Sequence, residues 1–338
     1  MASDDTVEEG RRRAARVKAL ARDVGFDLCG ITGTALPEAY ARYRAAMDAG
    51  YGAAMGWLAD KPELRADARH VWPEARSVIA LGVSYASPDV PGVTELAPSD
   101  DEAWIARYAQ GKDYHLVVKK MLVALAHRLA DDPELGHIAS ERHRCFVDTG
   151  PVLEKAFAQA AGLGWIGKSS LLVRRLPTAR EAAADHAGPG TWFFLATILT
   201  PLELAHDTPE TDHCGSCTRC MDVCPTAAFP APYVLDARRC IATWTIESES
   251  PAAVIDPATL GPHVFGCDLC QEVCPYNRRA VPTRHDALRP RPENVRPKRA
   301  ALASLVAAGE PAFRARFPKS AVRRVTAAQL GETLAARR

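Results

Sequence analysis

Cysteine is the residue of this 338-residue chain whose type and spacing most clearly indicate chemistry. Cys214, Cys217, Cys220 and Cys224, followed at once by Pro225, form the pattern CxxCxxCxxxCP. In a chain that holds two [4Fe-4S] clusters, three cysteines of such a run bind one cluster and the fourth binds the other. The run therefore predicts a pair of clusters and a second set of cysteines to complete them.

The second set of cysteines has a modified spacing. Cys240 stands alone, upstream of Cys267, Cys270 and Cys274, which with Pro275 keep the end of the pattern as CxxCxxxCP. The same crossing rule divides all eight thiols between two clusters. The first cluster is assigned Cys214, Cys217, Cys220 and Cys274, and the second is assigned Cys224, Cys240, Cys267 and Cys270.

Zinc is the alternative occupant of these cysteines, because CxxC pairs also suit tetrahedral zinc sites. Zinc sites rarely use interleaved triplets that end in Cys-Pro, so the cluster interpretation is preferred. The two remaining cysteines, Cys29 and Cys145, belong to neither pattern and are predicted to be plain buried thiols.

Composition places the chain among globular proteins. Hydrophobic residues make up 47% and charged residues 25%, and no apolar run approaches the roughly 18 residues of a membrane span. The arginines at 11–13 could mimic a twin-arginine export signal, but no apolar stretch follows them. We therefore expect a cytoplasmic protein without a membrane segment, in which closely spaced cysteines serve ligation rather than disulfides.

The elements that must position these cysteines are predicted from hydrophobic periodicity. The stretch 6–24 predicts a helix, and another should follow Asp113, a typical N-cap residue. A third helix is predicted to begin at Gly150 and Pro151. Strands are expected over 28–31, 78–85, 145–148, 171–174 and 192–199. This alternation of helices and strands predicts an α/β or α+β body.

One apparent phosphate-binding motif is rejected. Residues 162–169 read GLGWIGKS and match GxxxxGK[ST], which cradles phosphates when it joins a strand to a following helix. Here a predicted helix comes first and a predicted strand follows, so no helix N-terminus is available for phosphate.

Seven stretches of the chain resemble the epoxyqueuosine reductase family, in the same order along the sequence. They read ARYAQGKDYH (106–115), FVDTGPVLEK (146–155), GLGWIGKSSLLV (162–173), GTWFFLATILT (190–200), HCGSCTRCMDVCPTAA (213–228), YVLDARRCIATWTIE (233–247) and FGCDLCQEVCPYN (265–277). Each segment without cysteines is weak alone, but their joint order is specific.

The resemblance implies a cobalamin-dependent enzyme that reduces the epoxide of epoxyqueuosine to an alkene at the wobble position of tRNA. The two clusters would supply electrons to the cobalt. It also implies an α/β (α+β) cobalamin-binding catalytic domain over 1–205 and an inserted bacterial-ferredoxin-like 2[4Fe-4S] module over 206–280. A short, basic, helical C-terminal region would occupy 281–338.

Asp148, in the VDTGP stretch, corresponds to the family's proton donor. An acid at the carboxyl end of a predicted strand also lies where open α/β sheets place ligands. Because a donor must be protonated at the working pH, burial near the corrin is expected to raise its pKa. The alternative is that Asp148 caps the helix that follows it.

Other site residues follow from the resemblance alone. The candidate cobalamin contacts, besides Asp148, are Arg65, Lys168 and Ser170, each of which could equally be an ordinary surface or turn residue. The candidate substrate-side residues are Tyr108, Lys112, Tyr114 and His115, although Tyr114 and His115 could simply lie on a helix face.

Positive charge is concentrated at the end of the chain. From Arg278 to Arg338 there are fifteen Lys or Arg and four acidic residues, a net charge of +11, whereas the whole chain carries +1. Because Lys and Arg contacts to phosphate dominate nucleic-acid affinity, tRNA is the expected partner, through its anticodon stem-loop. The candidate contacts are Lys298, Arg299, Arg323 and Arg324. The alternative is a solvated helical surface.

Two other functions remain open at this point. A cobalamin-dependent reductive dehalogenase shares the paired clusters, but the basic tail and the missing export signal disfavour it. A ferredoxin-like electron carrier would leave some 200 residues before the clusters without a purpose. For the favoured enzyme we expect an external low-potential electron donor and a monomeric chain.

Overall fold

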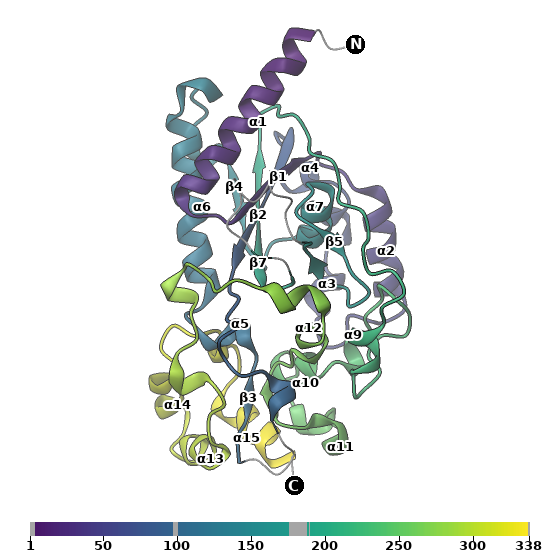
Figure 1. Ribbon diagram of the computed structural model, residues 1–338, viewed down its shortest axis with the longest axis vertical. Helices are drawn as coiled ribbons and strands as arrows, with labels where there is room; N and C mark the ends of the chain where they lie inside the picture. The colour runs from purple at the N-terminus through teal and green to yellow at the C-terminus, as the bar shows by residue number, and fades with distance from the viewer. Residues whose placement is uncertain (1–3, 97–100, 176–187, 189, 337–338) are drawn as a thin grey trace.

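The computed structural model describes residues 4–96, 101–175, 188 and 190–336 of the chain. A four-stranded sheet occupies the upper part of the molecule in Figure 1, and the cysteine-rich segments and the C-terminal helices lie below it. None of the helices in the described part of the chain is both long enough and apolar enough to cross a membrane.

The helices and strands have the following bounds. The helices are α1 (Asp4–Val24), α2 (Pro37–Asp48), α3 (Gly56–Ala59), α4 (Ala68–Val71), α5 (Arg107–Gln110), α6 (Tyr114–Asp131), α7 (Glu154–Ala160), α9 (Arg219–Asp222), α10 (Ile241–Ile246), α11 (Pro257–Leu260), α12 (Leu269–Glu272), α13 (Arg299–Ala307), α14 (Glu310–Arg316) and α15 (Ala327–Ala336). The strands are β1 (Leu28–Thr32), β2 (Ser77–Ser84), β3 (Trp104–Ile105), β4 (Arg144–Phe146), β5 (Trp165–Ile166), β6 (Leu172–Val173), β7 (Phe193–Thr200) and β8 (His263–Phe265).

The main sheet has the strand order β1-β2-β7-β4, and each neighbouring pair is antiparallel. Ile79 in β2 lies between Ile31 in β1 and Ile198 in β7. Every residue of β2 is buried, which explains why its sequence between Ser77 and Ser84 has no polar side chain instead of alternating. The predicted mixture of helices and strands is confirmed, and the antiparallel sheet shows it to be the α+β form.

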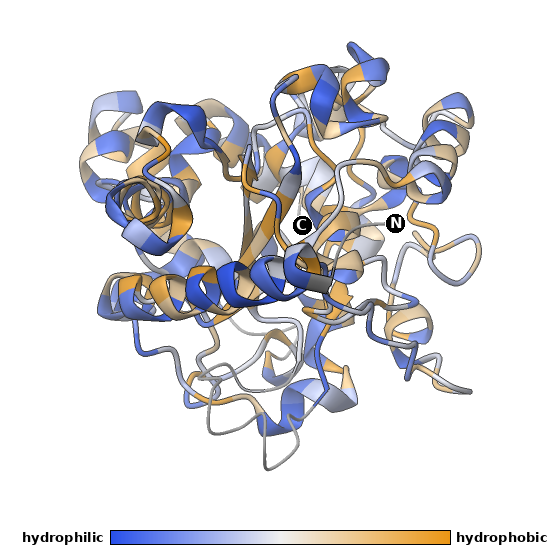
Figure 2. Cartoon of the chain, turned by 90° about the horizontal axis from the view of Figure 1, so that it is seen from above, coloured by the Kyte–Doolittle hydropathy of each residue, from blue (hydrophilic) through white to orange (hydrophobic). Residues whose placement is uncertain are grey.

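Helices cover both faces of this sheet, and the apolar strands run between helices of mixed hydropathy (Figure 2). On one face, α1 and α6 bury Val17 and Leu122 against β2 residues such as Leu81. On the other face, α7 packs so closely that a side chain on Gly30 would meet the carbonyl oxygen of Ala161 at 2.1 Å. Glycine is therefore required at this position, because the backbones approach within reach of any Cβ.

Two predicted elements end or begin elsewhere. The predicted strand 145–148 ends at Phe146, and the helix expected to start at Gly150 and Pro151 begins only at Glu154. The intervening residues are irregular, and Asp148 has a positive φ of 60°. The proline-first helix start was therefore wrong, because the chain forms a turn there instead.

A second hydrophobic core joins three distant parts of the chain. Strand β3 pairs in parallel with β8, which lies just before Cys267. Phe265 packs in one cluster with Ile105, from the body, and with Phe313 and Leu330, from the C-terminal helices. The C-terminal helices are thus anchored to the cysteine-rich part, while the exact boundaries 1–205, 206–280 and 281–338 remain predictions.

Candidate functional site

Cys274 lies with three thiols that precede it by more than fifty residues in the sequence. Burial, together with the neighbouring thiols of Cys214, Cys220 and Cys217, raises the pKa of Cys274 to about 11. Burial also raises the pKa of Cys220, again with contributions from Cys214 and Cys217. The structure therefore brings together the four thiols that were assigned to the first cluster.

The other four predicted ligands form a second group. Burial raises the pKa of Cys267 well above its usual value, and the nearby Cys240 and Cys224 thiols add to this effect. The pKa of Cys270 is raised by burial and then by Cys267 and Cys240. Cys220 also acts on Cys270, so the two groups of four are adjacent.

Hydrogen-bond donors point at several of these sulfur atoms. Trp165 Nε1 donates to Cys214 Sγ at 3.4 Å, and the Ala228 N–H donates to Cys224 Sγ at 3.3 Å. Burial raises the pKa of Cys240, but backbone N–H groups at the start of α10 oppose that rise. Donors of this kind stabilise thiolate ligands and tune cluster potentials, so the donor set suits iron-sulfur clusters.

Single-ion sites differ from this arrangement. Across residues 4–96, 101–175, 188 and 190–336, no three His, Cys, Asp or Glu side chains converge closely enough to hold one metal ion. The eight thiols instead form the two groups of four described above, and four thiolates are the ligand number of a [4Fe-4S] cluster.

The GLGWIGKS stretch connects the body to the first thiol group. Helix α7 precedes it, and β5 and β6 then form an antiparallel hairpin, so its context is not that of a phosphate-binding loop. Lys168 Nζ, at the turn of this hairpin, donates to the carbonyl oxygens of Gly215 at 2.6 Å and Cys217 at 3.1 Å. The lysine thus holds the loop that carries the first ligands.

Asp148 is the centre of a hydrogen-bonded group drawn from three segments. Tyr114 Oη donates to Asp148 Oδ2 at 2.8 Å, and His115 Nε2 lies 3.3 Å from the same oxygen. His115 Nδ1 lies 2.9 Å from Asp113 Oδ1, so the imidazole bridges two carboxylates. The Asp148 N–H donates to both carboxyl oxygens of Glu154, at 3.1 and 3.2 Å.

These contacts lower the pKa of Asp148 and raise those of His115 and Glu154. Burial raises the pKa of Asp148, but hydrogen bonds with His115 and Tyr114 outweigh it, and the net pKa lies below the usual carboxyl range. Hydrogen bonds with Asp113 and Asp148 raise the pKa of His115 to about 9. Burial and the Asp148 charge raise the pKa of Glu154 to about 8.

The structure bears on two statements about Asp148, namely the raised pKa expected near the corrin and the alternative that this residue caps the following helix. Its pKa is lowered in the protein alone, not raised, because its charged form gains hydrogen bonds from Tyr114 and His115. Asp148 also does not cap α7, whose N-cap residue is Leu153. At neutral pH the acidic protons of this group reside on His115 and Glu154.

Among the substrate-side candidates, Tyr108 packs beside Tyr114, whereas the contact of Lys112 lies elsewhere. The Tyr108 ring lies 6.0 Å from the Tyr114 ring, measured between centroids, and burial raises the pKa of Tyr108. Tyr114 itself is stacked on Phe194 at 4.3 Å. The backbone N–H of Lys112 donates a hydrogen bond to the carbonyl oxygen of Ala287.

The cobalamin candidates have different surroundings. Arg65 is 8% exposed, and its guanidinium donates to the carbonyl oxygens of Asp60 and Trp57 at 2.9 and 3.2 Å. Ser170 has a positive φ of 59°, and its hydroxyl is buried without a partner among the described residues. A buried, unpaired hydroxyl is costly unless a further group satisfies it, so Ser170 fits a polar contact to a bound cofactor.

The basic candidates of the tail are partly paired. Lys298 Nζ lies 3.2 Å from Glu102, and Arg324 forms a two-point ion pair with Glu247 at 2.6 and 3.0 Å. Arg299 donates to the carbonyl oxygen of Leu334. Arg324 is the member near the Asp148 group, because its charge helps to lower the pKa of Asp148.

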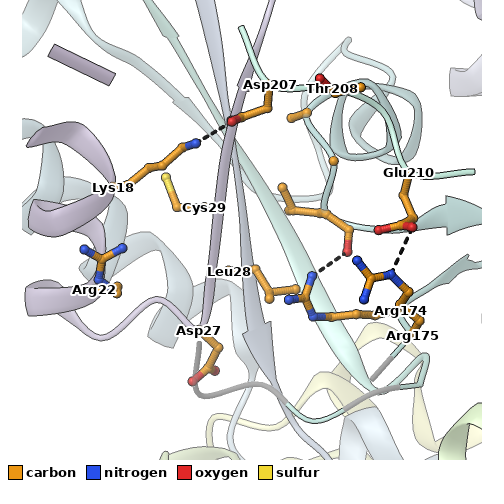
Figure 3. A pocket seen from close by; sticks show the side chains of 13 residues that line it. Lys18, Arg22, Asp27, Leu28, Cys29, Arg174, Arg175, Asp207, Thr208 and Glu210 are labelled. Atoms are coloured by element: carbon orange, nitrogen blue, oxygen red, sulfur yellow. Dashed lines mark hydrogen bonds and ion pairs between the residues drawn. The ribbon is translucent and has the colours of Figure 1, made fainter. Parts of the chain in front are cut away.

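A separate pocket of ≈340 Å³ lies between α1, β1 and the segment 207–210 (Figure 3). None of the predicted site residues lines it. Lys18 pairs with Asp207 on its wall, and burial raises the pKa of Cys29 to about 12. Its thiol is therefore protonated at neutral pH, as expected for a plain thiol, although the residue is half-buried.

Glu154 is the site residue that the sequence did not reveal. It lies in the FVDTGPVLEK stretch, six residues after Asp148, but nothing in its local pattern distinguishes it from an ordinary first residue of a helix. Only the turn at Asp148, with its positive φ, brings the backbone N–H to the Glu154 carboxyl group.

Grouped thiols that suit electron-carrying clusters, and an aspartate between proton-bearing side chains, are together the working parts of an iron-sulfur oxidoreductase. Residues 213–277 match the model of a 4Fe-4S double cluster binding domain, which supports the presence of iron-sulfur clusters. Residues 65–149 match the model described as Epoxyqueuosine reductase QueG, DUF1730.

Known proteins agree with these matches. The chain is 42% identical over 270 residues to an epoxyqueuosine reductase of Xanthomonas campestris, covering 80% of this chain and 71% of the relative. It superposes on epoxyqueuosine reductase with an epoxyqueuosine-modified tRNA-Tyr stem loop with a TM-score of 0.80 at 26% identity, covering 95% of this chain and 80% of that one. A Bacillus subtilis epoxyqueuosine reductase, with its catalytic loop swung out of the active site, gives 0.78 at 26% identity with the same coverage. The chain belongs to the epoxyqueuosine reductase family.

Proposed function

We propose that the chain reduces the epoxide of epoxyqueuosine in tRNA to the alkene of queuosine. This reaction consumes two electrons and two protons and releases the epoxide oxygen as water. The observation that carries the proposal is that one chain contains both a route for electrons and a source of protons. The two groups of four thiols would hold the electron carriers, and Asp148, bonded to His115, would deliver the protons. Family membership favours this activity over a dehalogenase or an electron carrier.

Two [4Fe-4S] clusters would carry the electrons. We assign the first to Cys214, Cys217, Cys220 and Cys274, and the second to Cys224, Cys240, Cys267 and Cys270, and the mutual effects of these thiols on their pKa values support this division. Because Cys220 also acts on Cys270, electrons would pass between adjacent clusters.

Cobalamin, when bound, would supply the reducing metal centre that delivers electrons to the epoxide. We assign Ser170 and Asp148 as polar contacts, because the Ser170 hydroxyl is unpaired and the Asp148 side chain is 51% exposed. Arg65 and Lys168 already donate to backbone carbonyls. Their contribution would be to hold the loops that surround the corrin.

Asp148 would pass a proton to the oxygen that leaves the epoxide. His115 would replace that proton, since it contacts the same carboxyl oxygen and is protonated at neutral pH. Tyr114, stacked on Phe194 and bonded to Asp148, would hold the carboxyl group in place. The Asp148 to Glu154 bond would keep this loop at the site, whereas the loop of a relative is known to swing out.

The tRNA would approach from the side of Arg324, which lies close enough to Asp148 to influence its pKa. Arg323, Lys298 and Arg299 would add phosphate contacts, and Tyr108 and Lys112 would lie on the substrate side. An extruded base of the anticodon loop would reach the pocket, as in other enzymes that act on bases. We further propose a monomeric, cytoplasmic enzyme reduced by an external low-potential donor, because a reducing compartment keeps thiol ligands free.

Anaerobic purification tests the proposal directly. Iron, cobalt and corrin absorption should show about eight irons and one corrin per chain. The preparation should then convert epoxyqueuosine to queuosine in a tRNA stem-loop, followed by nucleoside mass spectrometry. A colourless, zinc-containing protein, or a loaded protein that leaves the epoxide intact, would contradict it.

A further inference from the structure

A hollow of ≈490 Å³ lies on the surface of the cysteine-rich part, between α9 and α12. These two short helices pack against each other and appear side by side in Figure 1. The residues around the hollow all belong to the cysteine-bearing runs or follow them directly. They are Arg219, Asp222, Val223, Glu272, Val273 and Arg278.

The hollow lies where the two groups of thiols meet. Cys220 is part of α9 and Cys270 is part of α12, and the two thiols interact electrostatically. One belongs to each proposed cluster. A redox partner seated between the two helices would therefore be close to both electron carriers.

Other sides of the cysteine-rich part are covered by the chain itself. Lys168 and Trp165 of the body contact the loop of Cys214 and Cys217. On the side of the second group, His263 of the buried strand β8 contacts Cys267. Arg219 and Arg278, by contrast, are exposed at the rim of the hollow.

The charges around the hollow do not cancel. Glu272 is paired with the buried Arg107 at 2.6 Å, which neutralises it. Asp222 accepts a hydrogen bond from Thr218 Oγ1 at 2.8 Å. The guanidinium groups of Arg219 and Arg278 have no ion pair or hydrogen bond with any residue that the structure describes, so these two positive charges exceed the one negative charge that Asp222 keeps.

From this hollow, with its positive rim and its half-buried floor of Val223 and Val273, we propose a docking site for a small, acidic, one-electron carrier protein. The inference rests on the proposed function, which requires two electrons per epoxide. Each encounter oxidises the carrier by one electron and reduces one cluster by one electron, and no bond forms or breaks. Such redox encounters are brief and bury less than about 1,200 Å², so electrostatic attraction contributes most to their formation.

The test measures cluster reduction without tRNA, so its outcome does not depend on the epoxide reaction. Reduced flavodoxin is mixed with the reconstituted protein in a stopped-flow instrument, and cluster bleaching is followed at several salt concentrations. Arg219→Glu and Arg278→Glu should each lower the second-order rate constant by about tenfold at low salt. The difference from the unmodified chain should shrink as salt screens the charges.

Two controls separate docking from damage to the clusters. Arg128→Glu makes the same charge change on the exposed surface of α6, across the molecule, and should leave the rate unchanged. Dithionite, a small reductant, should reduce all variants equally. If Arg219→Glu loses iron, because it lies between Cys217 and Cys220, Arg278→Glu decides the question. Flavodoxin rates that match the unmodified chain in Arg278→Glu, or that fall equally in Arg128→Glu, would overturn the docking site.

Discussion

The thiol groups and the Asp148 group are organised in opposite ways. Three of the four thiols in the first group come from a run of seven residues, 214–220, and hydrogen bonds from the chain surround their sulfur atoms. The Asp148 group takes two residues from α6, one from the turn after β4 and one from the start of α7. Its central side chain is 51% exposed.

This difference reflects what each region must do. A cluster needs rigid ligands at set spacing, and short loops provide them with little help from the rest of the fold. A proton donor must lose and regain a proton, so its pKa must be adjusted by groups of opposite effect. Asp148 obtains these groups, His115 and Tyr114, from a helix that the sheet brings beside it.

Removal of two ligands together tests the crossing of the thiol groups and has the largest expected effect. Cys217→Ala combined with Cys274→Ala should destroy one cluster and leave about four of about eight irons, because both thiols serve the first cluster. The matched pair Cys217→Ala and Cys270→Ala should lose both clusters. Turnover should vanish in each. Equal iron contents in the two double variants would contradict the crossing.

Asp148→Ala should reduce turnover by about 10²–10⁴-fold, the usual contribution of a general acid. Iron content should stay unchanged, because the thiol groups do not depend on this side chain, and cobalamin should still bind through its other contacts, Ser170 among them. Single-turnover conversion of the epoxide, measured with fully reduced protein, isolates the chemical step. A normal rate would remove Asp148 from proton delivery.

Neutralising Lys298, Arg299, Arg323 and Arg324 to Gln should weaken tRNA binding by about tenfold or more at low salt and flatten its salt dependence. The slope of log affinity against log salt concentration should change by less than the value for four phosphate contacts. The reason is that Lys298 and Arg324 already pair with Glu102 and Glu247. Fluorescence anisotropy with a labelled stem-loop measures both quantities. Binding equal to that of the unmodified chain would assign these charges to solubility.

Glu154→Ala should lower turnover by about tenfold, because the Asp148 N–H loses its acceptor and the loop loses roughly one hydrogen bond of stability. Glu154→Gln keeps an oxygen in the same place and should recover most of the rate. The loss should appear in kcat, with KM for the tRNA nearly unchanged, since Glu154 touches Asp148 and not the tail. If both variants behave alike, the bond does not position the loop.

The rate should also depend on pH through His115. Its hydrogen bonds raise its pKa to about 9, so the imidazole is protonated below that pH and loses its proton as pH rises through it. Turnover should therefore be maintained near neutrality, halve near pH 9 and fall at higher pH. His115→Gln should lower the turnover rate near neutral pH and remove its decrease at alkaline pH. If the rate of the variant still decreases near pH 9, another group is responsible for the pH dependence.

The sequence predicted most elements of the body but not the direction of its strands. The strands expected over 28–31, 78–85 and 192–199 are present as β1, β2 and β7 with ends shifted by one residue, and Asp113 does cap α6 with its side chain. Apolar runs of this kind are consistent with parallel or antiparallel neighbours, since β2 is buried on both faces. The pairing of β2 with β1 and β7 is a long-range choice that local pattern does not specify.

The site was predictable to the extent that its chemistry is local. Asp148, Tyr114 and His115 were named from their stretches and do lie together. The predicted rise of the Asp148 pKa near the corrin stays a prediction, whereas in the protein alone the hydrogen bonds with His115 and Tyr114 outweigh burial and lower this pKa. Glu154 was missed because its contact is made through the backbone of Asp148, not through its own position in a pattern.

Sequence alone determined the number of thiols and their spacing, and therefore the kind of cofactor they suit and the predicted division of the ligands, because the two CxxCxxxCP endings are typical of paired cubanes. Tertiary structure decided that the protons of the Asp148 group reside on His115 and Glu154. The physical reason is the distance along the chain over which each property is determined. Ligand spacing depends on neighbours along the chain, whereas a pKa depends on every charge and donor that folding brings within a few ångströms.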